Sequence, residues 1–299
     1  MRLSARVKAY LALIAVSAIW GVAGVVIKAT LVYIPPFTFL FWRFVMICMV
    51  TIPWYIWYIR KHHLKFKDML PLTFLGYLGV TVYLAFVFEG FERTTALDGT
   101  LLGAITPIFI IILGVVLLKE KITKKEKLGL ALVMIGSLIT IIQPLLENHT
   151  FPVQNLLGNV LILAGGIIWS FFVFFSKRNF KHVSPLLITL HGSIVGLITY
   201  FPLALIENNF VFPHYQLLIT NKVSFFGVFY MAFISYVLAY ILYEYALSKI
   251  EISESSIFTY LHPLFAAPAA IVWLGEPLTI PFLIGAGIIA SGVVLSEWK

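Results

Sequence analysis

Charge is what this sequence has least of. Only 11% of its 299 residues are Asp, Glu, Lys or Arg, whereas 61% are hydrophobic, and the mean hydropathy is +0.99. A soluble domain carries about 25% charged residues, so this chain cannot cover a water-exposed surface with polar side chains. A large soluble protein is therefore excluded, and the composition is that of an integral membrane protein.

Cysteine and the common catalytic motifs are equally scarce. Cys48 is the single cysteine, so the chain forms neither an internal disulfide nor a cysteine-based metal site. The sequence contains no phosphate-binding GxxxxGK[ST] segment, no nucleophile elbow and no cluster of metal ligands. We therefore expect no cofactor, no bound metal and no enzymatic activity, and in particular no hydrolysis of ATP.

What the chain does have is an internal repeat. Matching residues lie 149 apart in the pairs Trp20 and Trp169, Lys28 and Lys177, and Pro36 and Pro185, and 156 apart in the pairs Pro107 and Pro263, and Glu120 and Glu276. Self-similarity in a fixed order indicates a duplicated unit. We expect a first five-helix repeat over residues 1–148 and a second over residues 149–299, which together form one transmembrane domain.

Long apolar stretches fill both repeats. A helix needs about 20 apolar residues to cross the hydrocarbon core, and we expect such helices at residues 8–28, 37–58, 70–90, 94–118, 125–143, 156–176, 184–206, 223–247, 252–274 and 278–297. Five spans per repeat, an odd number, turn the second repeat upside down. The predicted fold is an all-α membrane protein with ten transmembrane helices in two inverted five-helix repeats, an arrangement typical of secondary transporters.

Basic residues indicate how the chain is oriented. All but four of the 21 Lys and Arg residues fall at one set of predicted helix ends, the exceptions being Lys28, Arg43, Arg93 and Lys222. By the positive-inside rule that side is cytoplasmic. We therefore expect a multi-pass protein of a prokaryotic inner membrane with both termini in the cytoplasm. The net charge of +8 then reflects topology and not nucleic-acid binding.

Arg43 is the one basic residue predicted to lie inside a span. A charge within the bilayer costs roughly 3 kcal/mol or more and therefore indicates a candidate functional residue. Arg43 could hold a substrate carboxylate. It could instead be structural, paired with Glu89 or bonded to backbone carbonyl groups.

Three further titratable residues lie within predicted spans. His191 and His262 are candidates for binding substrate or exchanging a coupling proton, because histidine titrates near neutral pH. The alternative for each is a neutral histidine that is hydrogen-bonded in the core. Glu244 is a third candidate for coupling, and its alternative is to reach the membrane interface or meet Lys249.

Aromatic residues and two prolines complete the candidate site. The aromatic residues expected well inside spans are Trp20, Tyr83, Trp169, Tyr236, Tyr240 and Tyr260. Their ring faces can stack on an aromatic group or hold a cation, although each could also be a packing residue. Pro107 and Pro263 occupy equivalent positions and are predicted to kink their helices, forming either two hinges or two packing bends.

The chain as a whole resembles the EamA-type members of the drug/metabolite transporter superfamily. The resemblance rests on Ala18-Ile19-Trp20-Gly21, Pro36, Arg43-Phe44, Pro107 and Lys119-Glu120-Lys121-Ile122-Thr123, and on the echoes Trp169, Pro263 and Gly275-Glu276-Pro277-Leu278-Thr279. It implies a ten-helix basket that moves small metabolites by alternating access. It also implies a cavity lined mainly by spans 1, 3, 4, 6, 8 and 9, with the last span of each repeat outside it.

The expected function is therefore secondary transport of a small metabolite, and specifically export of amino acids or related compounds. An alternative is uptake of a small organic cation such as choline. An alternative of another class is a membrane-embedded enzyme or scaffold, although an enzyme would need a cluster of chemical groups at one depth. The expected partners are a small-molecule substrate and the lipid bilayer, without nucleic acid, for a monomer or homodimer.

Overall fold

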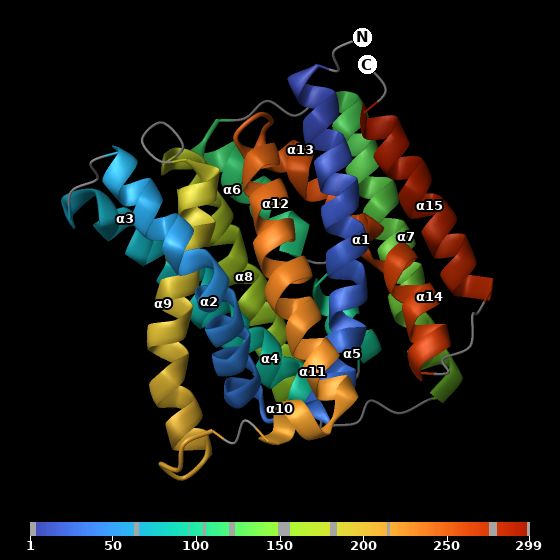
Figure 1. The fold of residues 1–299 in the computed structure, drawn as a ribbon. Helices are drawn as coiled ribbons and strands as arrows, with labels where there is room; N and C mark the ends of the chain where they lie inside the picture. Colours follow the sequence, from blue (N-terminus) through green and yellow to red (C-terminus); the bar gives the residue numbers. More distant parts are fainter. Residues whose placement is uncertain are drawn as a thin grey trace.

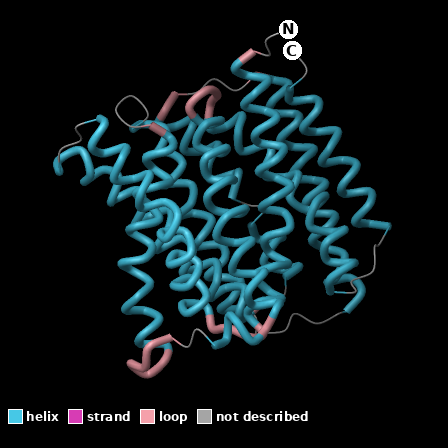
Figure 2. Tube along the Cα trace, viewed as in Figure 1, coloured by secondary structure: helices cyan, strands magenta, loops and turns pink. Residues whose placement is uncertain are grey.

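The computed structural model describes residues 4–62, 66–94, 96–103, 106–119, 123–148, 156–179, 184–213, 216–274 and 280–297. Within these ranges the chain is helical apart from turns and short connections, without a strand (Figures 1 and 2). Glu120, Glu276 and the 149–155 connection, which contains the predicted repeat boundary, lie outside the described residues. The predicted all-α membrane fold is confirmed.

The first half of the chain forms eight described elements. They are α1 (Ala5–Leu31), α2 (Pro36–His62), α3 (Phe66–Gly76), the π-helix η1 (Tyr77–Val82), α4 (Tyr83–Arg93), α5 (Ala96–Gly103), α6 (Thr106–Leu117) and α7 (Lys124–Asn148). Helix α1 begins after Ser4, whose side chain accepts a hydrogen bond from the Val7 amide at 3.3 Å. This is the standard way in which serine satisfies a free amide at a helix start.

The second half follows the same plan with two short elements added, α10 and η4. Its elements are α8 (Leu156–Asn179), α9 (Pro185–Glu207), α10 (Gln216–Thr220), α11 (Lys222–Phe229), the π-helix η3 (Tyr230–Leu238), α12 (Ala239–Leu247), α13 (Ile252–Ile257), the 3₁₀ helix η4 (Phe258–Leu261), α14 (His262–Leu274) and α15 (Ile280–Glu297). Helix α9 begins with Pro185 after a Ser184 cap, which suits a residue whose missing amide is not needed there.

The number of membrane crossings is only partly confirmed. Within the described residues, seven helical segments are long and apolar enough to cross a membrane. Helix α6 and the Leu283–Gly292 part of α15 are apolar but shorter. Within the stretch 94–118, predicted as one span, the described helical residues are α5 and α6, and residues 104 and 105 between them lie outside the described residues. The predicted count of ten is therefore not confirmed by length and hydropathy.

Two π-helical segments were not predicted. They are η1, between α3 and α4, and η3, between α11 and α12. Residues 77–82 of η1 lie 156 positions before residues 233–238, which fall inside η3, so the two segments obey the sequence repeat. A π-helix widens the helical turn and is frequent at functional sites.

The helices pack in pairs that cross between the two halves. Helix α1 packs against α12 and α14, and α8 packs against α4 and α6; α2 packs against α9, and α7 lies beside α15 (Figure 1). The packing of α1 on α12 and α14 is repeated, with the two halves exchanged, by the packing of α8 on α4 and α6. The start of α1 and the end of α15 lie at one end of the bundle, here named the Arg6 end, and α1 finishes at the opposite end, the Lys28 end.

Close contact between these helices depends on two glycines. A Cβ on Gly21 of α1 would lie 2.6 Å from the His262 carbonyl oxygen of α14. A Cβ on Gly166 of α8 would lie 2.5 Å from the Thr106 Oγ1 of α6. Small residues let membrane helices approach this closely. These two contacts hold α1 against α14 and α8 against α6, so that the first helix of each half packs on a helix of the other half.

Candidate functional site

A cavity of about 160 Å³ lies between the two halves of the chain. Its wall is formed by α1, α2, α4, α5 and α6 from the first half and by α8, η3, α12, η4 and α14 from the second. Among its described lining residues none belongs to α7 or α15. This agrees with the lining that the family resemblance implies, with the addition of Arg43 from α2. The predicted site residues on this wall are Trp20, Arg43, Tyr83, Trp169, Tyr240 and His262.

Aromatic rings form one side of the cavity. The rings of Trp20 and Trp169 meet edge to face, with centroids 5.5 Å apart. Tyr240 lies 5.6 Å from Trp20 and 5.7 Å from Trp169, and Tyr83 lies 4.7 Å from Trp169. The Trp20 Nε1 donates to the Ser235 carbonyl oxygen at 2.9 Å, which fixes the indole. Ring contacts of this type contribute about 0.5–1.5 kcal/mol each beyond burial, so the cluster is rigid and presents faces to a bound molecule.

Arg43 is the cation of the cavity wall. Its side chain is 1% exposed, and its guanidinium lies 5.5–6.0 Å from the ring centroids of Phe44, Phe88 and Tyr236. Within the described residues, its Nε and Nη1 have no hydrogen-bond partner. A buried guanidinium with unused donors is costly. The rings offset part of that cost, and the free donors remain available to an anion.

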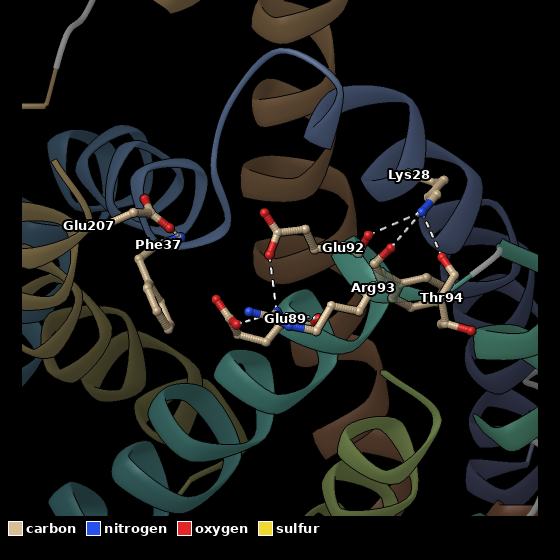
Figure 3. A network of polar contacts seen from close by, with 8 residues as sticks. Lys28, Phe37, Glu89, Glu92, Arg93, Thr94 and Glu207 are labelled. Atoms are coloured by element: carbon tan, nitrogen blue, oxygen red, sulfur yellow. Dashed lines mark hydrogen bonds and ion pairs between the residues drawn. The ribbon is translucent and has the colours of Figure 1, made fainter. Parts of the chain in front are cut away.

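Of the alternatives for Arg43, pairing with Glu89 is not found among the described residues. Glu89 forms an ion pair with Arg93, one turn further along α4 (Figure 3). Arg93 also bonds Glu92 at 3.0 Å. The reason is geometric, since residues four apart on one helix are neighbours. Glu89 therefore has a local partner near the Lys28 end, and Arg43 is left facing the cavity.

Known proteins place the chain in a family. The model of the EamA-like transporter family matches residues 7–142 and 156–298. The chain belongs to the EamA-like transporter family. A solved crystal structure of another protein is 16% identical and superposes with a TM-score of 0.72, covering 99% of this chain and 98% of that one. That likeness shows the shared fold.

Curated relatives extend over almost the whole transporter. The uncharacterized transporter YyaM of Bacillus subtilis (strain 168) is 26% identical and covers 96% of this chain and 93% of its own. A probable amino-acid metabolite efflux pump of Salmonella typhimurium is also 26% identical, covering 96% and 93%. One of the same description from Escherichia coli (strain K12) is 25% identical, covering 93% and 91%.

Two predicted tyrosines of this EamA-like transporter lie away from the cavity wall. Tyr236 lies behind Tyr240, with ring centroids 4.4 Å apart, and its hydroxyl donates to the Thr189 carbonyl oxygen at 3.1 Å. Tyr260 is fully buried in a small separate cluster with Ile257. Tyr236 supports the wall through Tyr240 and Arg43, whereas the structure does not bring Tyr260 to the cavity.

The two predicted histidines are in different surroundings. His262 lines the cavity, with its ring perpendicular to that of Trp20 at 6.3 Å. His191 lies outside the lining, and both of its ring nitrogens have partners. Tyr55 Oη is 2.5 Å from Nδ1 and Thr73 Oγ1 is 2.8 Å from Nε2. His191 thus has the geometry of the hydrogen-bonded core histidine, and His262 is the histidine within reach of a bound molecule.

Glu244 neither reaches the interface nor meets Lys249, so that alternative is wrong, and its coupling role remains a prediction. The carboxylate is fully buried, and its Oε2 accepts a hydrogen bond from Ser176 Oγ at 2.6 Å. Its Oε1 has no partner among the described residues. Lys249 instead lies over the Tyr245 ring, 5.8 Å from the centroid. Glu244 sits inside the bundle because α12 packs against α1 and α9 on both sides.

The two repeat-related prolines each follow a residue of the cavity wall. Pro107 comes directly after Thr106 in α6, and residues 104 and 105 before it lie outside the described residues. Pro263 comes directly after His262, within one helical run over Ile252–Trp273, where the 3₁₀ helix η4 passes into α14. Proline within such a run removes a backbone hydrogen bond, and the predicted kink and hinge roles of both prolines remain predictions.

One polar cavity residue was missed although the sequence contained the signal. Thr106 lines the cavity directly before Pro107, and at the repeat spacing of 156 it is the counterpart of His262. Its carbonyl oxygen is 3.5 Å from Ser170 Oγ. Thr100, Ser235 and Thr259 also line the cavity. Their spacing gives no such signal, because only the tertiary packing turns them towards it.

Proposed function

We propose that this chain is a secondary transporter that moves small metabolites by alternating access and exports amino acids or related compounds. The observation that carries the proposal is Arg43, a buried guanidinium with unpartnered donors on the wall of a central cavity. A carboxylate would supply the missing acceptors through a charge-assisted hydrogen bond. The substrate class that follows is a small molecule bearing a carboxylate.

The aromatic side of the cavity suits the rest of an amino acid. Trp20, Trp169 and Tyr240 present ring faces and edges from both halves. Such rings attract an ammonium group or pack against an apolar side chain. The cavity volume of about 160 Å³ limits the cargo to a small molecule. Two relatives described as probable amino-acid metabolite efflux pumps support this substrate class and the direction of transport.

The repeat supports the mechanism. The family model matches two successive segments, residues 7–142 and 156–298, in keeping with repeats over residues 1–148 and 149–299. The packing of α1 on α14 and of α8 on α6 is exchanged when the halves are exchanged. Two halves related in this way can rock around a fixed central site and open it to each side in turn. The predominance of Lys and Arg at the Arg6 end supports a cytoplasmic location for that end.

Uptake of an organic cation such as choline is the second candidate, and the aromatic cluster favours it. Four rings from Trp20, Tyr83, Trp169 and Tyr240 meet within 6 Å of one another in successive pairs, as in an aromatic cage. Arg43 on the same wall opposes it, because a guanidinium repels a cation that lacks a carboxylate. We therefore favour the amino acid.

Counterflow into proteoliposomes tests the proposal. Vesicles are loaded with one unlabelled amino acid at a time and diluted into the same labelled compound. Accumulation of label above that in protein-free vesicles is the expected result. The corresponding amino-acid amides, which lack the carboxylate, should exchange poorly. Exchange of choline without exchange of any amino acid would overturn the proposal in favour of the second candidate.

A further inference from the structure

A three-residue contact joins the two halves of the chain at the Arg6 end. The Arg6 guanidinium on α1 forms an ion pair with Glu254 on α13. Tyr10, one turn further along α1, donates its hydroxyl to the same carboxylate oxygen, and the Arg6 Nε donates to the Tyr10 hydroxyl. The Glu254 side chain is 9% exposed and that of Arg6 is 39% exposed. We name Arg6, Tyr10 and Glu254 the inner contact.

The inner contact continues into a closed seam. The Tyr10 ring packs on Phe258 of η4, with centroids 5.4 Å apart. Two turns further along α1, Ser17 Oγ donates to the Phe258 carbonyl oxygen at 2.6 Å, and the Ser17 side chain is 1% exposed. Helix α1 is therefore sealed against α13 and η4 from the Arg6 end up to the level of Ser17.

The cavity lies on the other side of this seam. On α1 its lining begins at Trp20 and continues through Ala23, Gly24 and Ile27 towards the Lys28 end. None of the described residues of α1 before Trp20 lines it. A route from the cavity to the Arg6 end along α1 requires that α1 separate from α13 and η4. That separation would break the ion pair, the tyrosine bond and the serine bond together.

The Lys28 end lacks an equivalent pair of charges. At the spacing of 149 the counterparts of Arg6 and Tyr10 are Asn155 and Asn159. Residue 155 lies outside the described residues, but an asparagine side chain carries no charge in any conformation. Asn159 accepts a hydrogen bond from Thr94 Oγ1 at 2.6 Å. At the spacing of 156 the counterpart of Glu254 is Asp98, so the acidic position is kept and the basic one is lost. The two ends of the bundle are thus chemically unequal, because the Arg6–Glu254 ion pair has no oppositely charged pair at the equivalent positions of the other end.

We infer that the inner contact is the gate that closes the transport site on the Arg6 side and that holds the resting protein open towards the Lys28 end. The inference rests on the proposed function, because a gate presupposes a transport path. An element that biases two states does so through interactions present in only one of them. The inner contact is present only when the Arg6 side is closed, so weakening it should populate the opposite state.

Thiol labelling in lipid nanodiscs tests the gate without any substrate. In a Cys48→Ala background, Ser17→Cys reports opening at the Arg6 end and Ala23→Cys reports the cavity side. Arg6→Gln or Glu254→Gln should increase the rate at which a maleimide modifies Ser17→Cys by about fivefold to tenfold, which corresponds to roughly 1–1.4 kcal/mol. Labelling of Ala23→Cys should slow in the same variants, because the two openings alternate.

Matched variants make the result specific. Combining Arg6→Glu with Glu254→Arg restores opposite charges and should return labelling of Ser17→Cys towards the parental rate. Arg93→Gln breaks the ion pairs within α4 (Figure 3) and should leave Ser17→Cys labelling unchanged. If Arg6→Gln or Glu254→Gln does not yield folded protein, Tyr10→Phe keeps the ring and the ion pair and should give a smaller increase of about twofold to threefold.

The outcomes separate the gate from the proposed function. Unchanged Ser17→Cys labelling in folded Arg6→Gln and Glu254→Gln variants overturns the gate, even if amino-acid counterflow is observed. The gate is also overturned if Arg93→Gln increases Ser17→Cys labelling as much as Arg6→Gln and Glu254→Gln do. Increased labelling that the charge swap reverses supports the gate. If counterflow of amino acids then failed, only the proposed cargo would be wrong.

Discussion

Lys28 and Lys177 make the same contact at opposite ends of the bundle. Each Nζ donates to carbonyl oxygens at the end of a helix in its own half: Lys28 to Phe91, Glu92 and Thr94, and Lys177 to Leu247 and Ile250. The lysines are 149 residues apart, and the acceptors Phe91 and Thr94 lie 156 residues before Leu247 and Ile250, as in the sequence repeat. Figure 3 shows the Lys28 contact. A cation on the free carbonyl groups of a helix end is stabilising.

Removing either lysine should destabilise the fold by a similar amount. We expect Lys28→Met and Lys177→Met each to lower the free energy of unfolding by about 1–3 kcal/mol, the contribution of a hydrogen bond to a charged group. Thermal unfolding of purified protein in detergent measures the effect. Lys249→Met is the control, because within the described part of the chain the Lys249 ammonium contacts only the Tyr245 ring. A loss in one variant alone would contradict the structural equivalence of the two contacts.

Pro107 and Pro263 should matter for movement more than for folding. Both directly follow a residue of the cavity wall, Thr106 or His262, and proline removes a backbone hydrogen bond and so disfavours a straight helix. Pro107→Ala and Pro263→Ala are expected to slow counterflow by more than they reduce the yield of folded protein. Equal losses of yield and activity would favour a packing role. Pro71→Ala in α3, outside the cavity lining, is the matched control.

The histidines should differ in their effect on proton coupling. His262 lines the cavity, whereas His191 is held by Tyr55 and Thr73. If His262 carries a coupling proton, His262→Gln should abolish the response of transport to an imposed pH gradient and leave substrate exchange intact. His191→Gln should keep the response. Glu244→Gln, at a buried carboxylate, belongs in the same series. An unchanged response in all three would indicate uniport or counter-exchange.

The paired tryptophans test the cation alternative. Trp20→Leu and Trp169→Leu keep apolar bulk but remove the ring faces that line the cavity. A tryptophan face contributes roughly 0.5–2 kcal/mol to binding a cation, equivalent to about 2- to 30-fold in affinity. A loss of that size for a quaternary amine, with little change for an aliphatic amino acid, would promote choline-like cargo. Unaltered affinity for every compound would make both residues packing residues.

The sequence predicted the internal repeat more completely than it predicted the site. Spacing alone related Trp20 to Trp169 and Pro107 to Pro263, and the structure places both tryptophans on one cavity wall. Spacing could not show which buried polar side chains would find a hydrogen-bond or ion-pair partner. The sequence allowed Arg43 and Glu89 to be partners. However, Arg93 lies one helical turn from Glu89 and forms the ion pair with it.

Other features depended on packing that no local pattern encodes. The π-helical segments η1 and η3 interrupt runs that are uniformly apolar in sequence, and periodicity does not register the one extra residue per turn. His191 and Tyr260 were at suitable depths but face neighbouring helices and not the cavity: His191 bonds Tyr55 and Thr73, and Tyr260 packs in a separate cluster. Depth in the membrane is readable from the sequence, whereas the direction of a side chain about the helix axis is set by the tertiary contacts.

Replacement of Arg43 by methionine tests the central claim most directly. A buried, unpaired guanidinium costs stability, and an apolar residue of similar length removes that cost. If Arg43 exists to bind a carboxylate, Arg43→Met should raise the thermal midpoint while reducing amino-acid affinity by about 10- to 150-fold, the value of a charge-assisted hydrogen bond of roughly 1.5–3 kcal/mol. A variant that is less stable but binds and exchanges amino acids normally would contradict the account.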